Sequence, residues 1–189
     1  TAILPSLFGT ELFMMAPEMN TLPTAIPLKG TPDSIRRLLD RDPPDLRTGL
    51  GARVFETAER FQAALRSRPT LDAWIRLYHP DLQGPMDVCE LIWGSAIFYA
   101  AYDEPELVQA LLERVTATYE RFLEAWRPFE HPADEPYTVH WSLLIRGRMM
   151  LRDDSAMNFS PAMYDTFIAP YDGRLLKRFG GAVHFCGRG

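Results

Sequence analysis

Apolar positions recur with helical spacing over several long segments of the chain. The clearest helix is predicted over residues 107–126, because leucine, valine and aromatic side chains follow one another at intervals of three and four. The same spacing predicts a helix over residues 50–66. A further helix is expected from Pro161 to the pair Gly180-Gly181, with Ser160 as its N-cap. Each of these helices should turn an apolar stripe toward a core.

Shorter elements fill the gaps between these helices. Two short helices are expected, one that begins at Thr31 and ends before Pro43, and one that begins near Asp87. Apolar runs too short for a helix predict strands at residues 74–78, within 141–151, and at 181–186. Helices and strands therefore alternate along the chain, which predicts an α/β architecture in one domain over residues 1–189.

Composition narrows the class of protein. The chain has 189 residues, 47% of them hydrophobic, which is enough to build one sizeable core. The net charge of −5 is scattered and forms no basic patch interleaved with aromatics, which argues against nucleic acid as a partner. Two cysteines, Cys89 and Cys186, are too few for a disulfide framework. With no signal peptide and no long uncharged apolar run, the sequence predicts a cytoplasmic protein without a membrane anchor.

The last strand places an imidazole and a thiol two positions apart. In an extended strand, residues two apart project from the same face, so His184 and Cys186 should point toward one place. Imidazole nitrogen and thiolate sulfur are good ligands for zinc, and together they form half of a tetrahedral site. The alternative is that His184 is a hydrogen-bonded strand residue and Cys186 a small buried hydrophobe.

Three predicted strands end in loops that carry residues capable of chemistry. In a parallel α/β barrel all such loops open on one face, so residues far apart in sequence converge there. The candidates are His79, Asp81, Gln83, Asp153, Asp154, Asn158, His184, Cys186 and Arg188. Asp81 and Gln83 have the alternative role of capping the helix that follows, and Asp153 and Asp154 that of a solvated turn. The role of His79 is left open. His140 is expected at the start of a strand, the end opposite to the loops that carry the candidates, and is expected to have a structural role.

A complete (β/α)8 barrel needs about 250 residues, more than this chain has. The chain would therefore supply about half to two-thirds of such a barrel. The chain begins without methionine and stops directly after a strand, which also leads us to expect a fragment.

Several short motifs, in order, resemble the uroporphyrinogen decarboxylase superfamily, which also contains zinc-dependent cobalamin:thiol methyltransferases. The matching pieces are Gln83-Gly84-Pro85, Tyr102-Asp103-Glu104-Pro105-Glu106-Leu107-Val108, Arg152-Asp153-Asp154-Ser155, Ser160-Pro161-Ala162-Met163-Tyr164, Pro170-Tyr171 and His184-Phe185-Cys186-Gly187. They span roughly residues 80–189, whereas residues 1–79 match less distinctly. The resemblance implies a TIM barrel enzyme, of which this chain is a partial barrel without the N-terminal and last strands. Dimers are common in the superfamily.

The methyltransferase branch implies zinc as cofactor and a corrinoid, or a corrinoid protein, as partner. By resemblance, His184 and Cys186 are the first two zinc ligands, and a third cysteine is expected beyond Gly189. Zinc would lower the pKa of a bound thiol substrate, so that a thiolate is available at neutral pH to accept the methyl group. Cys89, among apolar residues of a predicted helix, is expected in the core instead.

The decarboxylase branch is the second hypothesis, and it needs no metal. It implies an essential aspartate that hydrogen-bonds the pyrrole nitrogens of uroporphyrinogen, with arginines that bind its acidic side chains. A His-x-Cys-Gly sequence is not typical of that branch. In either branch we expect Asp153 or Asp154 to face the site, as hydrogen-bond acceptor, substrate anchor or partner of His184. A third hypothesis is a barrel that binds a tetrapyrrole or a corrinoid protein without catalysis.

Overall fold

The computed structural model describes residues 2–21, 23–28, 30–131 and 136–186. The fold is mixed α/β, as expected, and helices hold 57% of the residues, so most of the core is built by helix packing. The strands of this described part pair as three two-stranded sheets. These sheets do not join into a closed barrel within the described residues.

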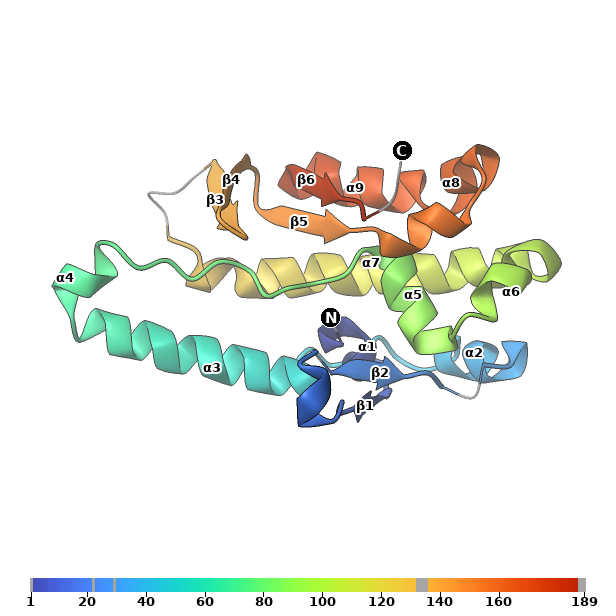
Figure 1. Ribbon diagram of the computed structural model, residues 1–189, viewed down its shortest axis with the longest axis horizontal. Helices are drawn as coiled ribbons and strands as arrows, with labels where there is room; N and C mark the ends of the chain where they lie inside the picture. The colour runs from blue at the N-terminus through green and yellow to red at the C-terminus, as the bar shows by residue number, and fades with distance from the viewer. Residues whose placement is uncertain (1, 22, 29, 132–135, 187–189) are drawn as a thin grey trace.

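The long helix α7 (Pro105–Trp126) forms the centre of the molecule. Figure 1 shows it between α3 (Gly49–Arg66) on one side and the layer that contains β5 and α9 on the other. Phe55 of α3 packs on Phe122 of α7 with ring centroids 5.1 Å apart, and both side chains are almost fully buried. The sequence prediction of both long helices is confirmed, and their apolar stripes meet in the core.

The remaining helices are short, and most of them pack on α7. They are α1 (Ile3–Leu7), α2 (Pro32–Leu39), α4 (Pro69–Asp72), α5 (Pro85–Trp93), α6 (Ile97–Asp103), α8 (Pro161–Phe167) and α9 (Ala169–Phe179), with 3-10 turns η1 (Pro17–Met19), η2 (Arg127–Phe129) and η4 (Asp154–Asn158). Ser160 caps α8 as predicted, its hydroxyl accepting a hydrogen bond from the backbone N–H of Met163. The expected single helix is divided at Ile168 into α8 and α9. Pro170 explains the break, because proline lacks the N–H that a continuous helix would use.

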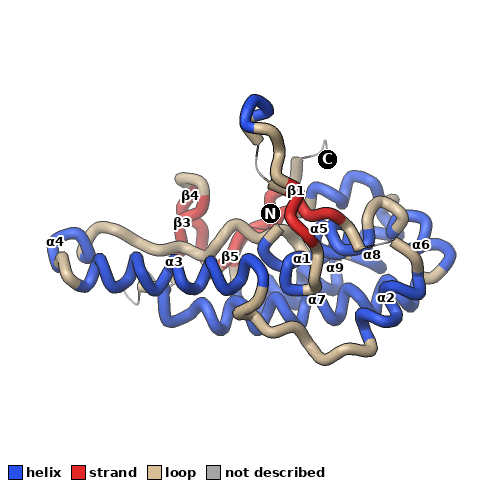
Figure 2. The backbone as a smooth tube through the Cα atoms, turned by 90° about the horizontal axis from the view of Figure 1, so that it is seen from below, coloured by secondary structure: helices blue, strands red, loops and turns tan. Residues whose placement is uncertain are grey.

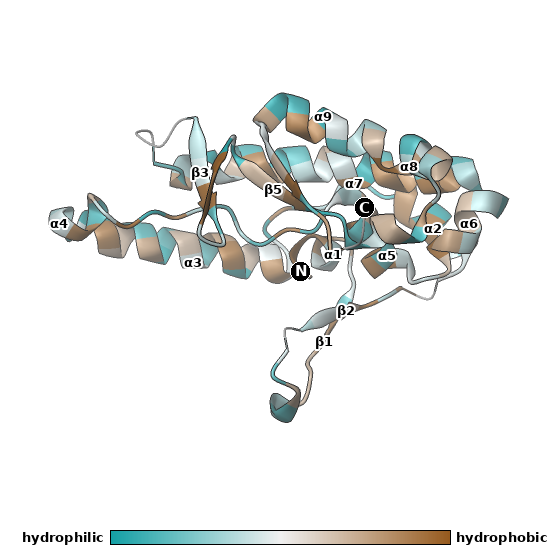
Figure 3. Cartoon of the chain, turned by 45° about the horizontal axis from the view of Figure 1, so that its top comes forward, coloured by the Kyte–Doolittle hydropathy of each residue, from teal (hydrophilic) through white to brown (hydrophobic). Residues whose placement is uncertain are grey.

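Two of the sheets are antiparallel hairpins. Strands β1 (Glu11–Phe13) and β2 (Thr24–Ile26) form an arm that stands away from the helices, as Figures 2 and 3 show from two directions. Strands β3 (Tyr137–His140) and β4 (Leu143–Arg146) form the second hairpin.

The third sheet is parallel and joins the segments that carry most candidate residues. Strand β5 (Met149–Arg152) pairs with β6 (Gly181–His184), and α8 and α9 connect them. This β–α–β unit is the element from which parallel α/β folds are built. Every residue of β5 is buried, although the strand ends in the charged Arg152, and Figure 3 shows the larger part of the strand in the brown of hydrophobic residues.

Two strand predictions need correction. Residues 74–78, predicted as a strand, form no regular element. These residues form an irregular segment instead, in which Trp74 is largely exposed to solvent. The predicted strand within residues 141–151 is divided into β4 and β5, because Gly147, with φ of 123°, turns the chain between them. Trp141 lies before β4, in the hairpin turn.

Close backbone contact fixes the parallel pair. Gly181 has φ of 137°, and a Cβ atom there would lie 2.0 Å from the carbonyl oxygen of Met149. Only glycine permits both this backbone conformation and this approach.

No helix among the described residues has the length and apolar character needed to span a bilayer.

We predict that Gly181→Ala lowers the free energy of unfolding by about 2–4 kcal/mol, because the methyl group forces β6 away from β5. Gly173→Ala is the matched control, because Gly173 is an exposed helical position with open space around it. Alanine there should raise the free energy of unfolding by about 0.5–1 kcal/mol. Urea unfolding of both variants measures the two effects, and equal stabilities would contradict the prediction.

Candidate metal centre

The carboxyl ends of β5 and β6 bring the two sets of candidate residues together. Arg152, the last residue of β5, lies opposite His184, the last residue of β6. The N–H of Asp153 donates to the carbonyl oxygen of His184 at 3.0 Å, which carries the pairing one residue further. Parallel strands end at the same edge of a sheet, so the residues after β5 and β6 share one side of the molecule.

Asp154, His184 and Cys186 form a cluster at this edge. One ligand atom from each, a carboxylate oxygen, an imidazole nitrogen and the thiol sulfur, lies within 4.8 Å of the others. His184 Nε2 and Cys186 Sγ are 2.9 Å apart, although Cys186 lies just beyond the end of β6. The predicted convergence of His184 and Cys186 is thus present, and Asp154 supplies a third donor.

The chemistry of the donor set fits a borderline-soft divalent cation. Thiolate, imidazole and carboxylate are the protein ligands of zinc, and three of them leave a fourth tetrahedral position for water or substrate. A hydrogen bond to the nearby Asp154 carboxylate raises the pKa of the Cys186 thiol, and loss of solvation and then the charge of Asp154 add to the shift. A bound divalent cation reverses this balance, since it stabilises a thiolate directly.

Asp87, in the first turn of α5, holds the turn that carries Asp154. Its two carboxylate oxygens accept hydrogen bonds from the N–H groups of Asp154, at 3.0 Å, and of Ser155, at 2.8 Å. The Ser155 hydroxyl also donates to Glu90 at 2.5 Å. Burial raises the pKa of Asp87 to about 6, although these hydrogen bonds oppose the shift. Asp87 was not a sequence candidate, although a charge within the apolar start of a helix was a usable signal.

Asp153 is not part of this cluster and interacts with Asp172 of α9 instead. It is buried, as is Asp172, and among the described residues no N–H or O–H group outside this pair donates to their carboxyl oxygens. The two carboxyls lie against each other, and such a pair forms a hydrogen bond only when one of them carries a proton. Burial first, and the charge of Asp153 second, raise the pKa of Asp172 to about 9, so Asp172 is the protonated partner at neutral pH.

Arg152 and Trp141 lie on the opposite side of β5 from the helices. The Arg152 guanidinium is buried, forms an ion pair with Asp81, and lies 3.2 Å from Nε2 of His140. It also lies over the indole of Trp141, 3.6 Å from the ring centroid. The candidate Asp81 therefore pairs with a cation of β5 and lies beside the strand end.

His79 is held by two hydrogen bonds that fix its tautomer. Its Nε2 accepts from the N–H of Met150 at 3.1 Å, so Nδ1 carries the hydrogen and donates to the carbonyl of Pro80 at 2.7 Å. Burial lowers the pKa of His79 to about 4, which keeps the ring neutral. The ring stacks on His140, with centroids 4.9 Å apart. Both histidines are buried. His140 is the last residue of β3 and its Nε2 lies 3.9 Å from Oδ1 of Asp81, so it lies beside candidate residues and not, as was expected, at the far end of a strand.

The other candidates have different places. Gln83 is largely buried beside the end of β5, where the next residue, Gly84, donates its N–H to the carbonyl of Arg152 at 2.7 Å. Asn158 is exposed at the end of η4. Arg188 lies outside the described residues. Cys89 is fully buried in α5, as predicted.

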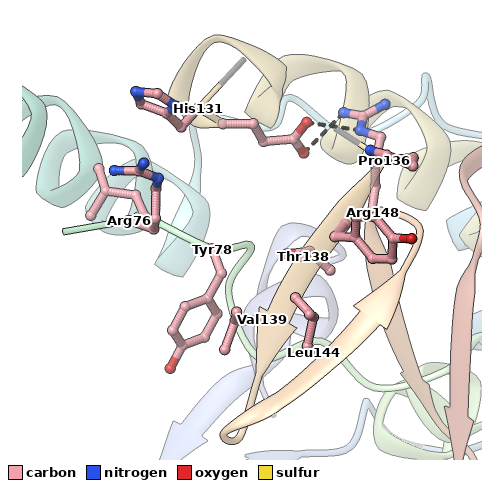
Figure 4. Close-up of a pocket in the computed structure, with 11 residues that line it drawn as sticks. Arg76, Tyr78, His131, Pro136, Thr138, Val139, Leu144 and Arg148 are labelled. Carbon is pink, nitrogen blue, oxygen red and sulfur yellow. Dashed lines mark hydrogen bonds and ion pairs between the residues drawn. The ribbon is translucent and has the colours of Figure 1, made fainter. Parts of the chain in front are cut away.

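A separate cavity of about 270 Å³ lies between the β3–β4 hairpin and residues 76–78 (Figure 4). Its walls are mostly apolar and include Tyr78, Val139 and Leu144, with the Arg148–Glu130 ion pair at one side. It shares no residue with the Asp154 cluster. The metal-ligand cluster, and not this cavity, is therefore the candidate site for chemistry.

No protein-family model matches this chain, and no curated protein sequence matches it.

We predict that Asp87→Ala weakens metal binding to the cluster by about tenfold, because the N–H groups of Asp154 and Ser155 lose their acceptor and the turn is no longer held. Asp87→Glu, which keeps a carboxylate, should recover part of the loss. Calorimetric zinc titration measures both. The prediction fails if Asp87→Ala binds zinc as tightly as the parent protein.

We predict a pH-dependent effect of Asp172→Asn. Because the folded-state pKa of Asp172 is raised, its stabilising contribution is complete below about pH 4 and is lost as pH rises toward 9. Asparagine still donates to Asp153 but does not titrate. The variant should therefore gain at least about 1 kcal/mol relative to the parent protein between pH 5 and pH 8. Urea unfolding at the two pH values measures this difference, and a gain independent of pH would contradict it.

Proposed function

We propose that this chain is part of an α/β barrel enzyme of the uroporphyrinogen decarboxylase superfamily, and that it uses zinc in methyl transfer between a corrinoid and a thiol. The observation that carries the proposal is the convergence of Asp154, His184 and Cys186, whose ligand atoms lie within 4.8 Å of one another. They stand at the carboxyl ends of two parallel strands, the edge at which α/β barrels place their sites.

The arrangement of the matching motifs supports the superfamily part of the proposal. Gln83 and Gly84 lie at the end of β5, next to the Asp153–Asp154 turn, although about 70 positions separate them in sequence. The connection from β5 through α8 and α9 to β6 is the repeating unit of a barrel. In this proposal, further strands complete the barrel around β5 and β6.

Each residue of the cluster has a role that its surroundings support. His184 and Cys186 bind the metal from the end of β6, and Asp154 binds it from η4, in the place for which a later cysteine was expected. Zinc in such a site supplies a Lewis acid that lowers the pKa of a bound thiol. Asp87 holds the Asp154 turn, and Trp141 meets the His184 ring edge to face at 5.2 Å, which limits the positions the ring can take.

The charges near the cluster favour methyl transfer over decarboxylation of uroporphyrinogen. That substrate carries many carboxylates and needs cations to bind it. Here the carboxylates of Asp154, Asp87 and Glu90 lie together, and the neighbouring cation among the described residues, Arg152, is already paired with Asp81. A site of this charge suits a thiol and a metal better than a polyanion.

We predict that the protein, purified without chelator or affinity metal, contains about one zinc ion per chain. His184→Ala and Cys186→Ala should each lose most of it, because two donors hold the ion far less tightly than three. Cys89→Ala is the matched control, since this buried cysteine lies in the core and should leave the zinc content unchanged. Elemental analysis measures all four proteins, and unchanged zinc in Cys186→Ala would refute the ligand assignment.

A reaction assay separates the three hypotheses. With methylcobalamin and a thiol, zinc-dependent loss of the methylcobalamin absorbance supports methyl transfer. Release of carbon dioxide from uroporphyrinogen without added metal would support decarboxylation instead. Binding of a corrinoid or a tetrapyrrole without either reaction would support a non-catalytic role.

A further inference from the structure

Trp141 occupies a backbone conformation that tryptophan rarely adopts. It has φ of 46° and its neighbour Ser142 has φ of 64°, so both central residues of the β3–β4 turn are left-handed. Such turns favour asparagine or glycine, and a bulky side chain there is a genuine outlier. Backbone strain of this kind persists where surrounding contacts hold it, and it is frequent at ligand sites.

The contacts that hold Trp141 also place it beside the metal-ligand cluster. Arg152 covers one face of the indole at 3.6 Å, and His184 meets the ring at 5.2 Å with an interplanar angle of 80°. The side chain nevertheless remains 49% exposed. A large apolar surface therefore lies open to solvent, directly next to a ligand of the proposed metal.

The charges around this surface restrict what it can bind. Arg152 already occupies one face of the indole, so a cationic ligand could not take that cation–π position. An anionic ligand would meet the carboxylate of Asp154, while the charge of Arg152 is balanced by Asp81. A flat, uncharged group avoids both penalties and gains from contact with the indole.

We propose that the indole of Trp141 forms one wall of a subsite for the uncharged aromatic substituent of a thiol substrate. This inference rests on the proposed function, because the metal held by Asp154, His184 and Cys186 binds the sulfur of that thiol. Trp141 thus distinguishes thiols by the group attached to the sulfur, whereas the metal ligands do not distinguish between thiols.

The test uses the protein loaded with Co²⁺, whose absorption reports a bound thiolate directly. Three thiols are titrated: phenylmethanethiol, ethanethiol and 3-mercaptopropionate. Phenylmethanethiol is expected to bind about tenfold more tightly than either of the others. The readout is the ratio of dissociation constants on metal-saturated protein, so differences in metal affinity do not enter it.

Two variants of Trp141 separate the ring from the turn. Trp141→Asn removes the indole but suits the left-handed backbone, so the hairpin is kept and the preference for phenylmethanethiol should be lost. Trp141→Phe keeps a flat ring and should retain most of the preference. Trp74→Ala is the control, because it removes a tryptophan that is 84% exposed and lies outside the cluster.

The outcomes separate the two proposals. If Co²⁺ binds and the Trp141→Asn protein keeps the full preference for phenylmethanethiol, the subsite is refuted while the metal centre stands. Equal binding of all three thiols by the parent protein refutes it as well. If the parent protein binds no Co²⁺, the metal centre is refuted and the subsite with it.

Discussion

The parallel pairing of β5 with β6 is the contact on which the candidate site depends. Main-chain hydrogen bonds set Arg152 opposite His184, and the N–H of Asp153 continues the pairing to the point where η4 begins. The pairing itself needs Gly181, since the backbone of β6 approaches Met149 so closely that no side chain fits between them. The distance from His184 to the Asp154 turn is therefore set by the backbone, before any ligand binds.

The buried carboxyl groups around this turn differ in their protonation states. Asp87 is surrounded by N–H donors, which stabilise its ionised form and offset part of the cost of burial. Asp153 and Asp172 have no such donors among the described residues, so one must keep a proton to satisfy the other. The same type of residue thus acts as an anion on α5 and as a neutral donor on α9, because the neighbours differ.

Sequence patterns predicted the long helices well, because the apolar spacing in α3 and α7 is long and regular. Residues 74–78 were wrongly expected to be a strand, since a short apolar run carries no information on whether a partner strand exists. The break at Ile168 was missed, although Pro170 was visible in the sequence.

The candidate site was likewise predictable from the sequence only in part. His184 and Cys186 were predictable because a period of two residues is local, and their convergence needs only an extended backbone. Asp87 contacts Asp154 from about 70 positions away, Trp141 contacts His184 from about 40 positions away, and no spacing rule links these pairs. Which aspartate of the pair faces the cluster depended on the direction of the chain after β5, and this is set by the hydrogen bonds to Asp87.

The place of the ligands on two strand ends has a consequence for folding. Asp154 and His184 are about 30 positions apart, and the segment between them contains both α8 and α9. A cation bound to both would act as a cross-link, because it closes this segment into a loop and so reduces the conformational entropy of the unfolded chain. The entropic cost of closing a loop grows with the logarithm of its length. A cross-link that spans the whole β–α–β unit therefore removes more entropy from the unfolded chain than one that spans a short turn. Metal occupancy would then report on the folding of the unit as a whole, and not only on the state of three side chains.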